Sequence, residues 1–534
     1  MSTDEVAVDP VDWRAIAGAL AEQLPGWEPR PGQRRMMAAV GAALISRVDL
    51  LVEAGTGTGK TLAYLLPILA RGQRAIIATA TRQLQSQILD HDLPLACAAA
   101  GVDLSVVALK GRSNYLCRLR IERQLLNVLA EDRVPSGALR QIMDVARGSK
   151  HGDIAEVPGI AEQDPIWPDV TSTGDNCLGS DCSFHDTCFV VLARRQAMKA
   201  DIVVVNHHLL LADHALRERW QGASLLPGVD VIVIDEAHAL EDVAAQLFGA
   251  SLSRHRIGAA LNELGEVQQE AGPAGAHLAG LAVELSLRTR SLFDAVSGLP
   301  AQVSLDPSHC RALAPPRDGL LTALEAVALA LTASDVAAAT GAGRLRETLA
   351  QLSADLSDLL DPERADGKDG YVRQVEHRRN GAAIVARPVA VGEILQRTLL
   401  AEPAVRIFTS ATLAMGEDFS HIRDRLGLTA AVSALRVPGE FDYHEQALLY
   451  LPADLPAPFA PGRDEAVAET IERLASAAGG GTFALFTSRR AMRDAWRRLD
   501  GRLPMRCLVQ GEESREAVLA RFVAEQPAVL FATM

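Results

Sequence analysis

The chain has few aromatic residues and no excess of positive charge, and both shortages narrow the kind of protein it can be. Aromatic residues make up 4% of its 534 residues, whereas hydrophobic residues of all kinds make up 48%. The hydrophobic cores are therefore expected to consist mainly of alanine, leucine and valine. The formal net charge is −14, which argues against a surface coated in basic residues but leaves room for a local basic groove that contacts phosphates.

The sequence also lacks long apolar runs and the pattern of a secreted protein. No run of about 18 apolar residues is present, so we expect no membrane span. The N-terminus is acidic and has neither the basic nor the apolar region of a signal peptide, which predicts a cytoplasmic protein. Seven cysteines in such a chain favour metal ligation or free thiols over disulfide bonds. The length allows three or four domains, and we expect a monomer.

A glycine-rich loop between an apolar run and a helical segment is the first sign of chemistry. Residues 53–61 read Glu-Ala-Gly-Thr-Gly-Thr-Gly-Lys-Thr and follow the apolar run 48–52. Glycines let backbone N–H groups close on phosphate oxygens, and the start of the next helix adds unpaired donors. Lys60 is expected to reach the β- and γ-phosphates, and the Thr61 hydroxyl to bind Mg²⁺. Ala54 stands where the phosphate-loop pattern has glycine.

Residues shortly before this loop suggest contacts to the rest of a nucleotide. Gln33 carries an amide donor and an amide acceptor, which suit the edge of adenine. Trp27 could stack on the base and Arg30 could contact the nucleotide, although each alone is equally an ordinary surface residue. The predicted ATP contacts are Gln33, Ala54, Gly55, Thr56, Gly57, Thr58, Gly59, Lys60 and Thr61.

The second half of a nucleotide hydrolase follows the apolar strand predicted at residues 229–234. Residues 235–238 read Asp-Glu-Ala-His. Asp235 is expected to hold the hydrated Mg²⁺, and Glu236 to orient and deprotonate the attacking water. His238 is placed to relay the state of the γ-phosphate. The predicted catalytic residues are Lys60, Asp235, Glu236 and His238.

Two further polar turns follow predicted strands. The turn at 81–85, after the strand at 74–79, has hydroxyl, guanidinium and amide groups that suit a nucleic-acid backbone; the alternative is a capped helix start without a ligand. The turn at 409–413, after the strand at 405–408, reads Thr-Ser-Ala-Thr-Leu. Its small hydroxyl residues make it a candidate coupling element between nucleotide state and motion.

Four cysteines bracket a segment at 118–170 that reads as helical and lacks strand alternation. Cys177, Cys182 and Cys188 lie within twelve positions, and Cys117 precedes the segment. Four thiolates can hold one iron–sulfur cube or one zinc ion. The spacing favours the cluster, because zinc sites usually have two short paired loops and Cys117 has no cysteine close by in sequence. Zinc and unligated cysteines remain the alternatives.

The remaining pattern divides into a helical stretch and a second set of strands. Residues 239–371 are rich in alanine and leucine, which predicts a helical domain inserted between motifs, or a passive bundle. Strands are expected again at 371–375 and 382–386. A second sheet is expected from strands at 446–451, 482–486, 506–509 and 528–531, with helices between them as βαβ units require.

Taken in order, these motifs resemble the DinG-type branch of the XPD-like superfamily 2 helicases. The segments that carry the resemblance are 30–33, 53–61, 110–117, the three clustered cysteines, 235–238, 409–413 and 486–488. The resemblance implies an α/β fold of two RecA-like parallel-sheet P-loop domains, the second incomplete, with an inserted iron–sulfur domain and an inserted helical arch. It implies ATP-driven 5′ to 3′ unwinding of DNA in repair or replication, with single-stranded and duplex DNA as partners.

The resemblance also assigns residues and boundaries. It implies that Cys117, Cys177, Cys182 and Cys188 ligate a [4Fe–4S] cluster. Tyr115, Arg112 and Arg118 become candidate contacts to single-stranded DNA. The expected domains are the first motor domain at 1–111, 191–242 and 371–420, the iron–sulfur insertion at 112–190, the arch at 243–370, and the second motor domain at 421–534.

The last residues of the chain resemble the start of a further family motif at 531–533. The arginine finger of the family would follow this motif, and loss of such a finger can lower a catalytic rate about 10³–10⁵-fold. The expectation is therefore a C-terminally truncated helicase that binds ATP and unwinds DNA poorly. The alternative is a catalytically impaired, nucleotide-gated DNA-binding or regulatory protein.

Overall fold

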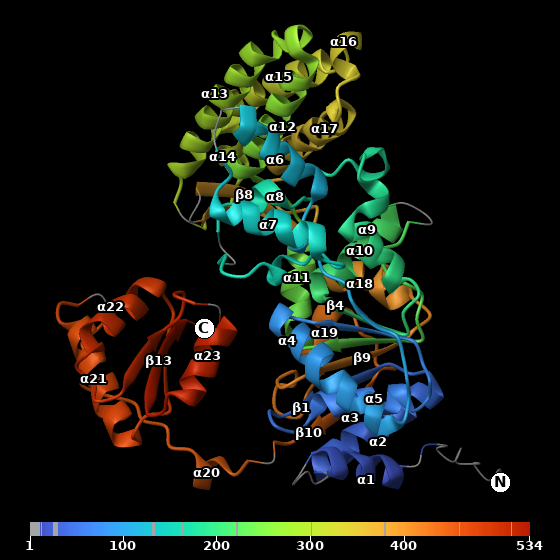
Figure 1. Ribbon diagram of the computed structural model, residues 1–534, viewed down its shortest axis with the longest axis vertical. Helices are drawn as coiled ribbons and strands as arrows, with labels where there is room; N and C mark the ends of the chain where they lie inside the picture. The colour runs from blue at the N-terminus through green and yellow to red at the C-terminus, as the bar shows by residue number, and fades with distance from the viewer. Residues whose placement is uncertain are drawn as a thin grey trace. The chain divides into compact units, whose positions relative to one another are not determined.

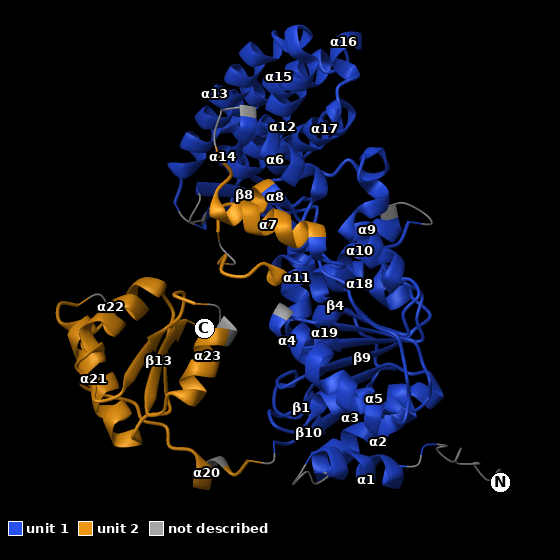
Figure 2. Cartoon of the chain, in the orientation of Figure 1, with its two compact units in different colours: residues 1–133, 148–154, 170–440 blue, residues 134–147, 155–169, 441–534 orange. Residues whose placement is uncertain are grey.

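The computed structural model divides the chain into two compact units (Figure 2). The first comprises Met1–Arg133, Gly148–Ile154 and Val170–Glu440, and the second comprises Val134–Arg147, Ala155–Asp169 and Phe441–Met534. The residues that the structure describes are 11, 13–24, 30–130, 134–161, 164–219, 223–300, 302–378, 381–439, 441–458, 460–513 and 515–533.

A seven-stranded sheet with only parallel pairings forms the centre of the first unit (Figure 1). Its order is β10-β1-β9-β5-β2-β4-β3. The strands are β1 (Leu50–Ala54), β2 (Ala75–Thr79), β3 (Val106–Ala108), β4 (Ile202–Asn206), β5 (Val231–Asp235), β9 (Val405–Ser410) and β10 (Ser433–Val437). The predicted strands of this sheet are thus confirmed, and β10 is added to them.

Helices cover both faces of this sheet, which is why most residues of its central strands are apolar. Leu50 and Val52 of β1 pack with one set of helices, α2 (Pro31–Ser46), α3 (Lys60–Leu69) and α5 (Leu93–Ala100). Leu51 points to the opposite face and packs with α10 (His207–Arg219), α11 (Leu240–Leu247), α18 (Gly392–Arg397) and α19 (Ser420–Leu426). Alternate residues of one strand therefore supply two separate cores.

The first sheet extends further along the chain than the sequence predicts. β10 pairs with β1 in parallel, from Leu50 opposite Ser433 to Ala54 opposite Val437. The sequence analysis assigns residues from 421 onward to the second motor domain, and this part of the assignment is wrong. β10 is an edge strand with mostly exposed side chains and an arginine, so its sequence carries little of the apolar pattern on which a strand prediction depends.

A helical bundle and a small antiparallel sheet share one core in the first unit. The bundle consists of α12 (Arg254–Ala271), α13 (Leu278–Ser297), α15 (Ala314–Ala330) and α17 (Ala342–Leu359), with the shorter α14 (Pro307–Ala312) and α16 (Ser334–Ala337). The sheet has the order β6-β8-β7, from β6 (Ala250–Ser253), β8 (Gly381–Pro388) and β7 (Tyr371–Arg378). Leu252 of β6 and Ile384 of β8 belong to the same buried cluster as Leu324 and Leu352 of the bundle. The predicted helices and the predicted strands β7 and β8 are confirmed, whereas β6 is not foreseen.

The segment between β3 and β4 is largely helical, as predicted. It contains α6 (Arg118–Ala130), α7 (Gly137–Gly148), α8 (Trp167–Val170) and α9 (Phe189–Ala197). Two ion pairs join helix α6 to α12 of the bundle. Arg120 Nη1 donates to Glu263 Oε1 at 2.7 Å, and Arg123 pairs with Glu266. All four side chains are largely shielded from solvent, so these ion pairs join the insertion to the bundle within the first unit.

A three-stranded parallel sheet of order β11-β13-β12 is the centre of the second unit. Its strands are β11 (Thr482–Phe486), β12 (Arg506–Val509) and β13 (Ala528–Thr533), and its helices are α21 (Arg463–Ala478), α22 (Arg489–Leu499) and α23 (Arg515–Ala524). Three of the four strands predicted for this sheet are confirmed.

The fourth strand predicted for the second sheet, at 446–451, is wrong. A single turn of helix, α20 (Tyr443–Gln446), takes its first residue. The rest has no regular structure, and Leu448 is 94% exposed. The run Ala-Leu-Leu-Tyr-Leu has the composition of a strand, but it finds no partner strand among the described residues, and a strand is stable only when its backbone groups are paired. Among the described helices, none is long and apolar enough to cross a bilayer.

The shared core of the bundle can be tested with two leucines on one helix. Leu324 of α15 is fully buried, whereas Leu329 of the same helix is 72% exposed. Leu324→Ala should lower the free energy of unfolding by about 2–5 kcal/mol, because it leaves a cavity among packed side chains. Leu329→Ala should change it by less than about 0.5 kcal/mol. Chemical denaturation followed by circular dichroism measures both, and equal losses would contradict this packing.

Candidate functional site

Three neighbouring strands bring the predicted motifs to one edge of the first sheet. β1, β9 and β5 are adjacent and parallel, so their carboxyl ends lie at the same edge. These ends are Ala54, Ser410 and Asp235. In open parallel sheets this edge is where ligands bind, and here it joins the phosphate loop, the 409–413 turn and the acidic pair.

Glycine is required at several positions of the loop between β1 and α3. Gly57 and Gly59 have φ angles of 77° and 78°, in the left-handed region that other residues rarely adopt. A side chain at Gly59 would also collide with the amide of Gln33. A Cβ at Gly55 would lie 2.7 Å from the Cα of Gly439. The loop is therefore closely packed by its neighbours as well as sharply turned.

The start of α2 holds the phosphate loop from one side. Gln33 is 3% exposed, and its Nε2 donates to the Gly59 carbonyl oxygen at 3.2 Å. The Arg30 guanidinium donates to the Gly57 carbonyl oxygen. The Gln33 amide therefore fixes the loop backbone in this structure, and its contact to adenine stays a prediction. Trp27 lies outside the described residues.

Side chains of the loop itself complete its hydrogen bonds. Thr58 Oγ1 donates to the Gly55 carbonyl oxygen at 2.7 Å. Lys60 Nζ donates to the Ala54 carbonyl oxygen at 3.2 Å. A backbone carbonyl is a neutral partner for an ammonium group, so phosphate oxygens would be a stronger acceptor at the same place.

The Asp235 carboxylate is nearly inaccessible and lies among polar groups. It is 5% exposed, and burial together with the charge of Glu236 raises its pKa to about 6, against the lowering effect of Lys60. Its Oδ1 accepts from the Glu236 backbone N–H at 3.1 Å, and its Oδ2 accepts from the Tyr64 hydroxyl at 3.5 Å. An oxygen-rich, partly uncompensated carboxylate of this kind suits a hard divalent cation.

Glu236 is held in an unusual conformation by the 409–413 turn. Its φ is 55°, a left-handed value that costs free energy in a non-glycine residue. The Ser410 hydroxyl donates to Glu236 Oε2 at 3.1 Å and lies 2.7 Å from His238 Nδ1. Since a serine hydroxyl has one proton, His238 Nδ1–H must be the donor in the second bond. The structure thus brings together the acidic motif and the predicted coupling turn.

Glu53 has a role that the sequence analysis does not assign. Its Oε2 accepts from the backbone N–H groups of Leu413 and Ala414, each at 2.7 Å, and its Oε1 accepts from Arg436 Nε at 2.9 Å. Burial raises the pKa of this carboxyl, but these bonds outweigh it and lower the pKa below its ordinary value. Glu53 therefore joins β1 to the turn after β9 and to β10. In the sequence, this role is indicated only by the presence of a carboxylate on an otherwise apolar strand.

The four predicted metal-ligating cysteines lie in one neighbourhood. Burial raises the pKa of the Cys117 thiol, and the charges of Cys188 and Cys182 raise it further. Burial and the charges of Cys177 and Cys188 likewise raise the pKa of Cys182. The Arg112 guanidinium donates to Cys177 Sγ. Across the described ranges, however, no three His, Cys, Asp or Glu side chains are grouped as ligands of an ion.

Two side chains that are candidates for contacting DNA, those of Tyr115 and Arg118, make contacts within the insertion. Tyr115 is 4% exposed, and its hydroxyl oxygen accepts from the Lys110 backbone N–H at 3.1 Å, so its ring is buried in this structure and its contact to single-stranded DNA stays a prediction. Arg118 Nε donates to the Thr187 carbonyl oxygen at 3.1 Å, and its guanidinium lies 4.3 Å from the centre of the Phe189 ring. These side chains pack around the cysteines rather than projecting from the insertion.

The turn at 81–85 is a capped helix start. Thr81 is the N-cap of α4 (Arg82–Gln87), and its Oγ1 accepts from the Leu84 backbone N–H at 3.3 Å. This bond satisfies one of the orphan donors at the helix N-terminus. It leaves the predicted contact to a nucleic-acid backbone as a prediction.

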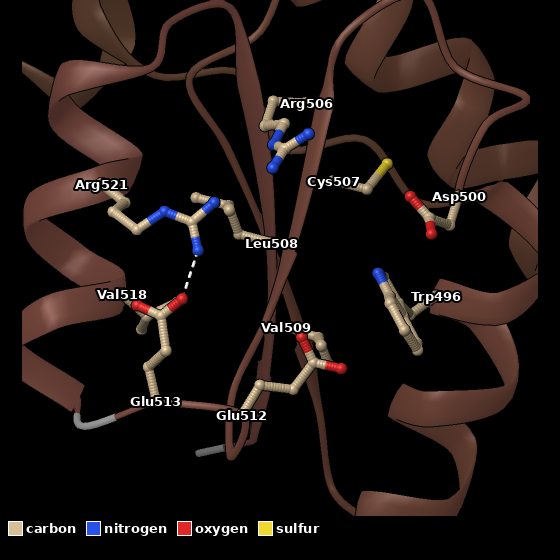
Figure 3. A pocket seen from close by; sticks show the side chains of 10 residues that line it. All are labelled: Trp496, Asp500, Arg506, Cys507, Leu508, Val509, Glu512, Glu513, Val518 and Arg521. Carbon is tan, nitrogen blue, oxygen red and sulfur yellow. Dashed lines mark hydrogen bonds and ion pairs between the residues drawn. The ribbon is translucent and has the colours of Figure 1, made fainter. Parts of the chain in front are cut away.

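A cavity of about 200 Å³ lies in the second unit, away from the predicted chemistry (Figure 3). It is bordered by the open edge of β12, with Trp496 of α22 on one side and Arg521 of α23 on the other. Arg521 pairs there with Glu513. No residue predicted to bind nucleotide, metal or DNA lines this cavity.

A glycine-rich phosphate loop beside an Asp-Glu-Ala-His strand end, on a parallel sheet, defines a P-loop protein of the helicase class. The family model described as DEAD/DEAH box helicase matches residues 30–130, and the model described as DEAD_2 matches residues 176–257. These ranges contain the phosphate loop and the acidic motif. A solved structure described as XPD_Helicase is 15% identical, with a TM-score of 0.49 over 95% of this chain and 80% of that chain.

Curated relatives place the chain within this class. The ATP-dependent DNA helicase YoaA of Escherichia coli (strain K12) is 37% identical over 99% of this chain and 81% of its own length. The ATP-dependent helicase DinG of Mycobacterium tuberculosis (strain ATCC 25618 / H37Rv) is 31% identical over 97% of this chain and 80% of its own length. The chain belongs to the DinG/YoaA family of ATP-dependent helicases.

The bond network around Ser410 can be tested by removing one hydroxyl. Ser410→Ala should lower the turnover of ATP on the order of tenfold, because Glu236 and His238 lose the group that joins them. Nucleotide affinity should stay unchanged, since the Ser410 hydroxyl bonds to Glu236 and His238 of the acidic motif. Steady-state phosphate release and equilibrium nucleotide binding measure the two quantities.

The matched control for this substitution is Ser433→Ala. Ser433 is an exposed residue of β10 in the same sheet, and its loss should leave both quantities as in the parent protein. A fall in nucleotide affinity for Ser410→Ala that equals its fall in turnover would contradict a role confined to the acidic motif.

Proposed function

We propose that the chain is a DNA motor that hydrolyses ATP to move 5′ to 3′ along single-stranded DNA and to unwind duplexes in DNA repair or replication. The observation that carries this proposal is the Ser410 hydroxyl between Glu236 and His238. It supplies a physical link from the proposed general base, Glu236, to the neighbouring strand β9, which a motor needs and a simple phosphatase does not. The family relationship supports DNA as the partner, and the resemblance to XPD-like helicases supports the direction.

Four residues would handle the nucleotide. Lys60 would exchange the Ala54 carbonyl for the β- and γ-phosphates of ATP. The Thr61 hydroxyl and the Asp235 carboxylate would hold Mg²⁺, and their oxygen donors fit this ion. Bound Mg²⁺ would neutralise charge on the phosphates. Glu236, whose carboxylate faces the same edge, would orient the attacking water and accept its proton.

The turn at 409–413 would pass the state of this site to the rest of the sheet. Any movement of Glu236 on loss of the γ-phosphate also moves Ser410, because the two are hydrogen-bonded. The same turn is tied to the phosphate-loop strand through the two bonds that Glu53 accepts from Leu413 and Ala414. Hydrolysis would therefore affect the 409–413 turn both through Glu236 and through Glu53. These two connections support a role for the turn in coupling nucleotide state to motion.

The cysteine-containing insertion and the helical bundle would form the body beside which single-stranded DNA passes. The ion pairs between α6 and α12, Arg120 with Glu263 and Arg123 with Glu266, support a fixed geometry for the two. With a net charge of −14, the chain would meet DNA through local basic and stacking groups rather than through its overall field.

The four cysteines would hold a [4Fe–4S] cluster. Their number and chemistry fit the four thiolates of such a cluster, and their mutual effect on pKa supports a common location. The Arg112 guanidinium on Cys177 supplies a positive charge that offsets that of a thiolate ligand. When bound, the cluster would supply a covalent crosslink that fixes the start and end of the insertion.

The proposed motor can be tested by DNA-dependent hydrolysis and by strand polarity. The parent chain should release phosphate faster with single-stranded DNA and should unwind duplexes with a 5′ tail in preference to a 3′ tail. Glu236→Gln should lower phosphate release by at least about 100-fold, because it removes the general base. The matched control is Glu393→Gln, an exposed glutamate of α18, which should behave as the parent.

The two measurements separate the alternatives. Nucleotide-dependent DNA binding without any DNA-stimulated phosphate release would replace the motor with a nucleotide-gated DNA-binding protein. A preference for 3′ tails would keep the motor and reverse its direction.

The proposed cluster can be tested by analysis of the anaerobically purified protein. We expect about four iron and about four sulfide per chain, and a large loss of both in Cys177→Ser. The matched control Cys97→Ser changes a cysteine outside the insertion and should keep the full complement. One zinc ion per chain without sulfide would establish the alternative four-thiolate site.

A further inference from the structure

Tyr64 is a tyrosine whose hydroxyl lies in an otherwise apolar core. It belongs to α3 and is fully buried, among the leucines and isoleucines that pack α3 on the sheet. Phenylalanine would fill the same space without a polar atom. Since a buried hydroxyl costs free energy unless it is hydrogen-bonded, its presence depends on what it contacts.

The contacts of this hydroxyl are all with polar groups next to the nucleotide site. It donates to Asp235 Oδ2 at 3.5 Å. The Thr61 side chain lies near enough to lower the pKa of this hydroxyl, against the larger raising effect of burial. Tyr64 follows Lys60 by four residues and Thr61 by three, which places the three side chains on neighbouring positions of one helix face.

The hydroxyl therefore stands between the two residues that would hold Mg²⁺. With it, each oxygen of the Asp235 carboxylate has one protein donor, since Oδ1 accepts from the Glu236 backbone N–H at 3.1 Å. A carboxylate oxygen accepts more than one bond, so each remains able to face a cation or its water ligands. Two donors from different elements fix the rotation of the carboxylate about its side-chain bonds.

A second carboxylate near the hydroxyl provides the competing explanation. Asp92 is 7% exposed and contributes to the electrostatic surroundings of Tyr64. Asp92 has other partners, because its Oδ2 accepts from Gln87 Nε2 at 3.5 Å and its Oδ1 lies 3.0 Å from His91 Nδ1. Among the described side chains, Tyr64 is the only one that donates a hydrogen bond to Asp235.

We propose that Tyr64 is a positioning residue for ATP hydrolysis, whose hydroxyl holds the Asp235 carboxylate opposite Thr61 in the orientation that receives Mg²⁺. This inference rests on the proposed function, in which Thr61 and Asp235 hold the ion. It assigns to α3 a third task beyond the contacts of Lys60 and Thr61, since the same helix then aligns the metal-binding strand β5.

Loss of the Tyr64 hydroxyl should weaken the effect of Mg²⁺ on nucleotide binding and leave metal-free nucleotide binding nearly unchanged. Tyr64→Phe keeps the ring in the core and removes only the hydroxyl. Affinity for a non-hydrolysable fluorescent ATP analogue is measured as Mg²⁺ is added. The Mg²⁺ concentration at half of the gain in affinity should rise about tenfold, because the loss of one hydrogen bond to a charged group has this scale. Affinity for the same analogue in EDTA should change less than about twofold, because Lys60 and the backbone N–H groups of the phosphate loop stay in place.

Two controls separate positioning from a general loss of structure. Thr289→Val removes a buried hydroxyl from α13 of the bundle, where it donates to the Leu285 carbonyl oxygen, and should leave the Mg²⁺ titration as in the parent. Turnover by Tyr64→Phe should recover toward the parent value at high Mg²⁺, which a misfolded site would not do.

A double-mutant cycle identifies the carboxylate through which Tyr64 acts. On an Asp235→Asn background, Tyr64→Phe should lower turnover by less than about a further twofold, because coupled residues are not additive. On an Asp92→Asn background, it should retain its full effect. The reverse pattern would overturn the proposal in favour of Asp92.

The remaining outcomes are equally distinct. Superimposable Mg²⁺ titrations for the parent and Tyr64→Phe would overturn this inference and leave the proposed function intact. A parent protein whose affinity for the analogue does not respond to Mg²⁺ at all would overturn the proposed function, and this inference with it.

Discussion

The burial of one carboxylate determines the arrangement at the edge of the first sheet. Asp235 ends a strand whose other residues are apolar, and it lies where solvent barely reaches. A charge in such a place is tolerated only with donors and opposite charge around it. Tyr64, the Glu236 backbone and Lys60 supply them, and each comes from an element that the parallel order of strands brings to the same edge. The phosphate loop, the acidic motif and the 409–413 turn are adjacent because this strand order is fixed.

Local patterns in the sequence sufficed where a residue's role depends on its immediate neighbours in the chain. The phosphate loop, the Asp-Glu-Ala-His motif and most strands are of this kind, because an apolar run followed by turn residues can be recognised from the local sequence alone. Prediction from the sequence was wrong or incomplete where a residue's structural partner lies far away in the chain. β10 is a weak strand that exists because β1 offers it an edge, and the run at 446–451 has strand composition without a partner. Glu53 and Tyr64 gain their roles from residues that lie 360 and 171 positions away in the chain.

The first unit combines a rigid sheet with parts that are joined to it by polar contacts. Its bundle has its own core, which includes β6 and β8, and the cysteine insertion meets the bundle through the ion pairs of α6 with α12. Polar, partly buried pairs hold surfaces in register while costing desolvation. The bundle core and the core of the seven-stranded sheet are separate, so the contacts of α6 are among those that join the cysteine insertion to the bundle.

The close approach of Gly55 to Gly439 connects the phosphate loop to the point where the chain leaves the first unit. The Gly55 backbone N–H donates to the Val437 carbonyl oxygen at 3.3 Å, and a Cβ at Gly55 would overlap Gly439. Residue 439 is separated by only one residue from the segment that begins the second unit. A side chain at position 55 would therefore collide with the backbone that lies just before the second unit in the sequence.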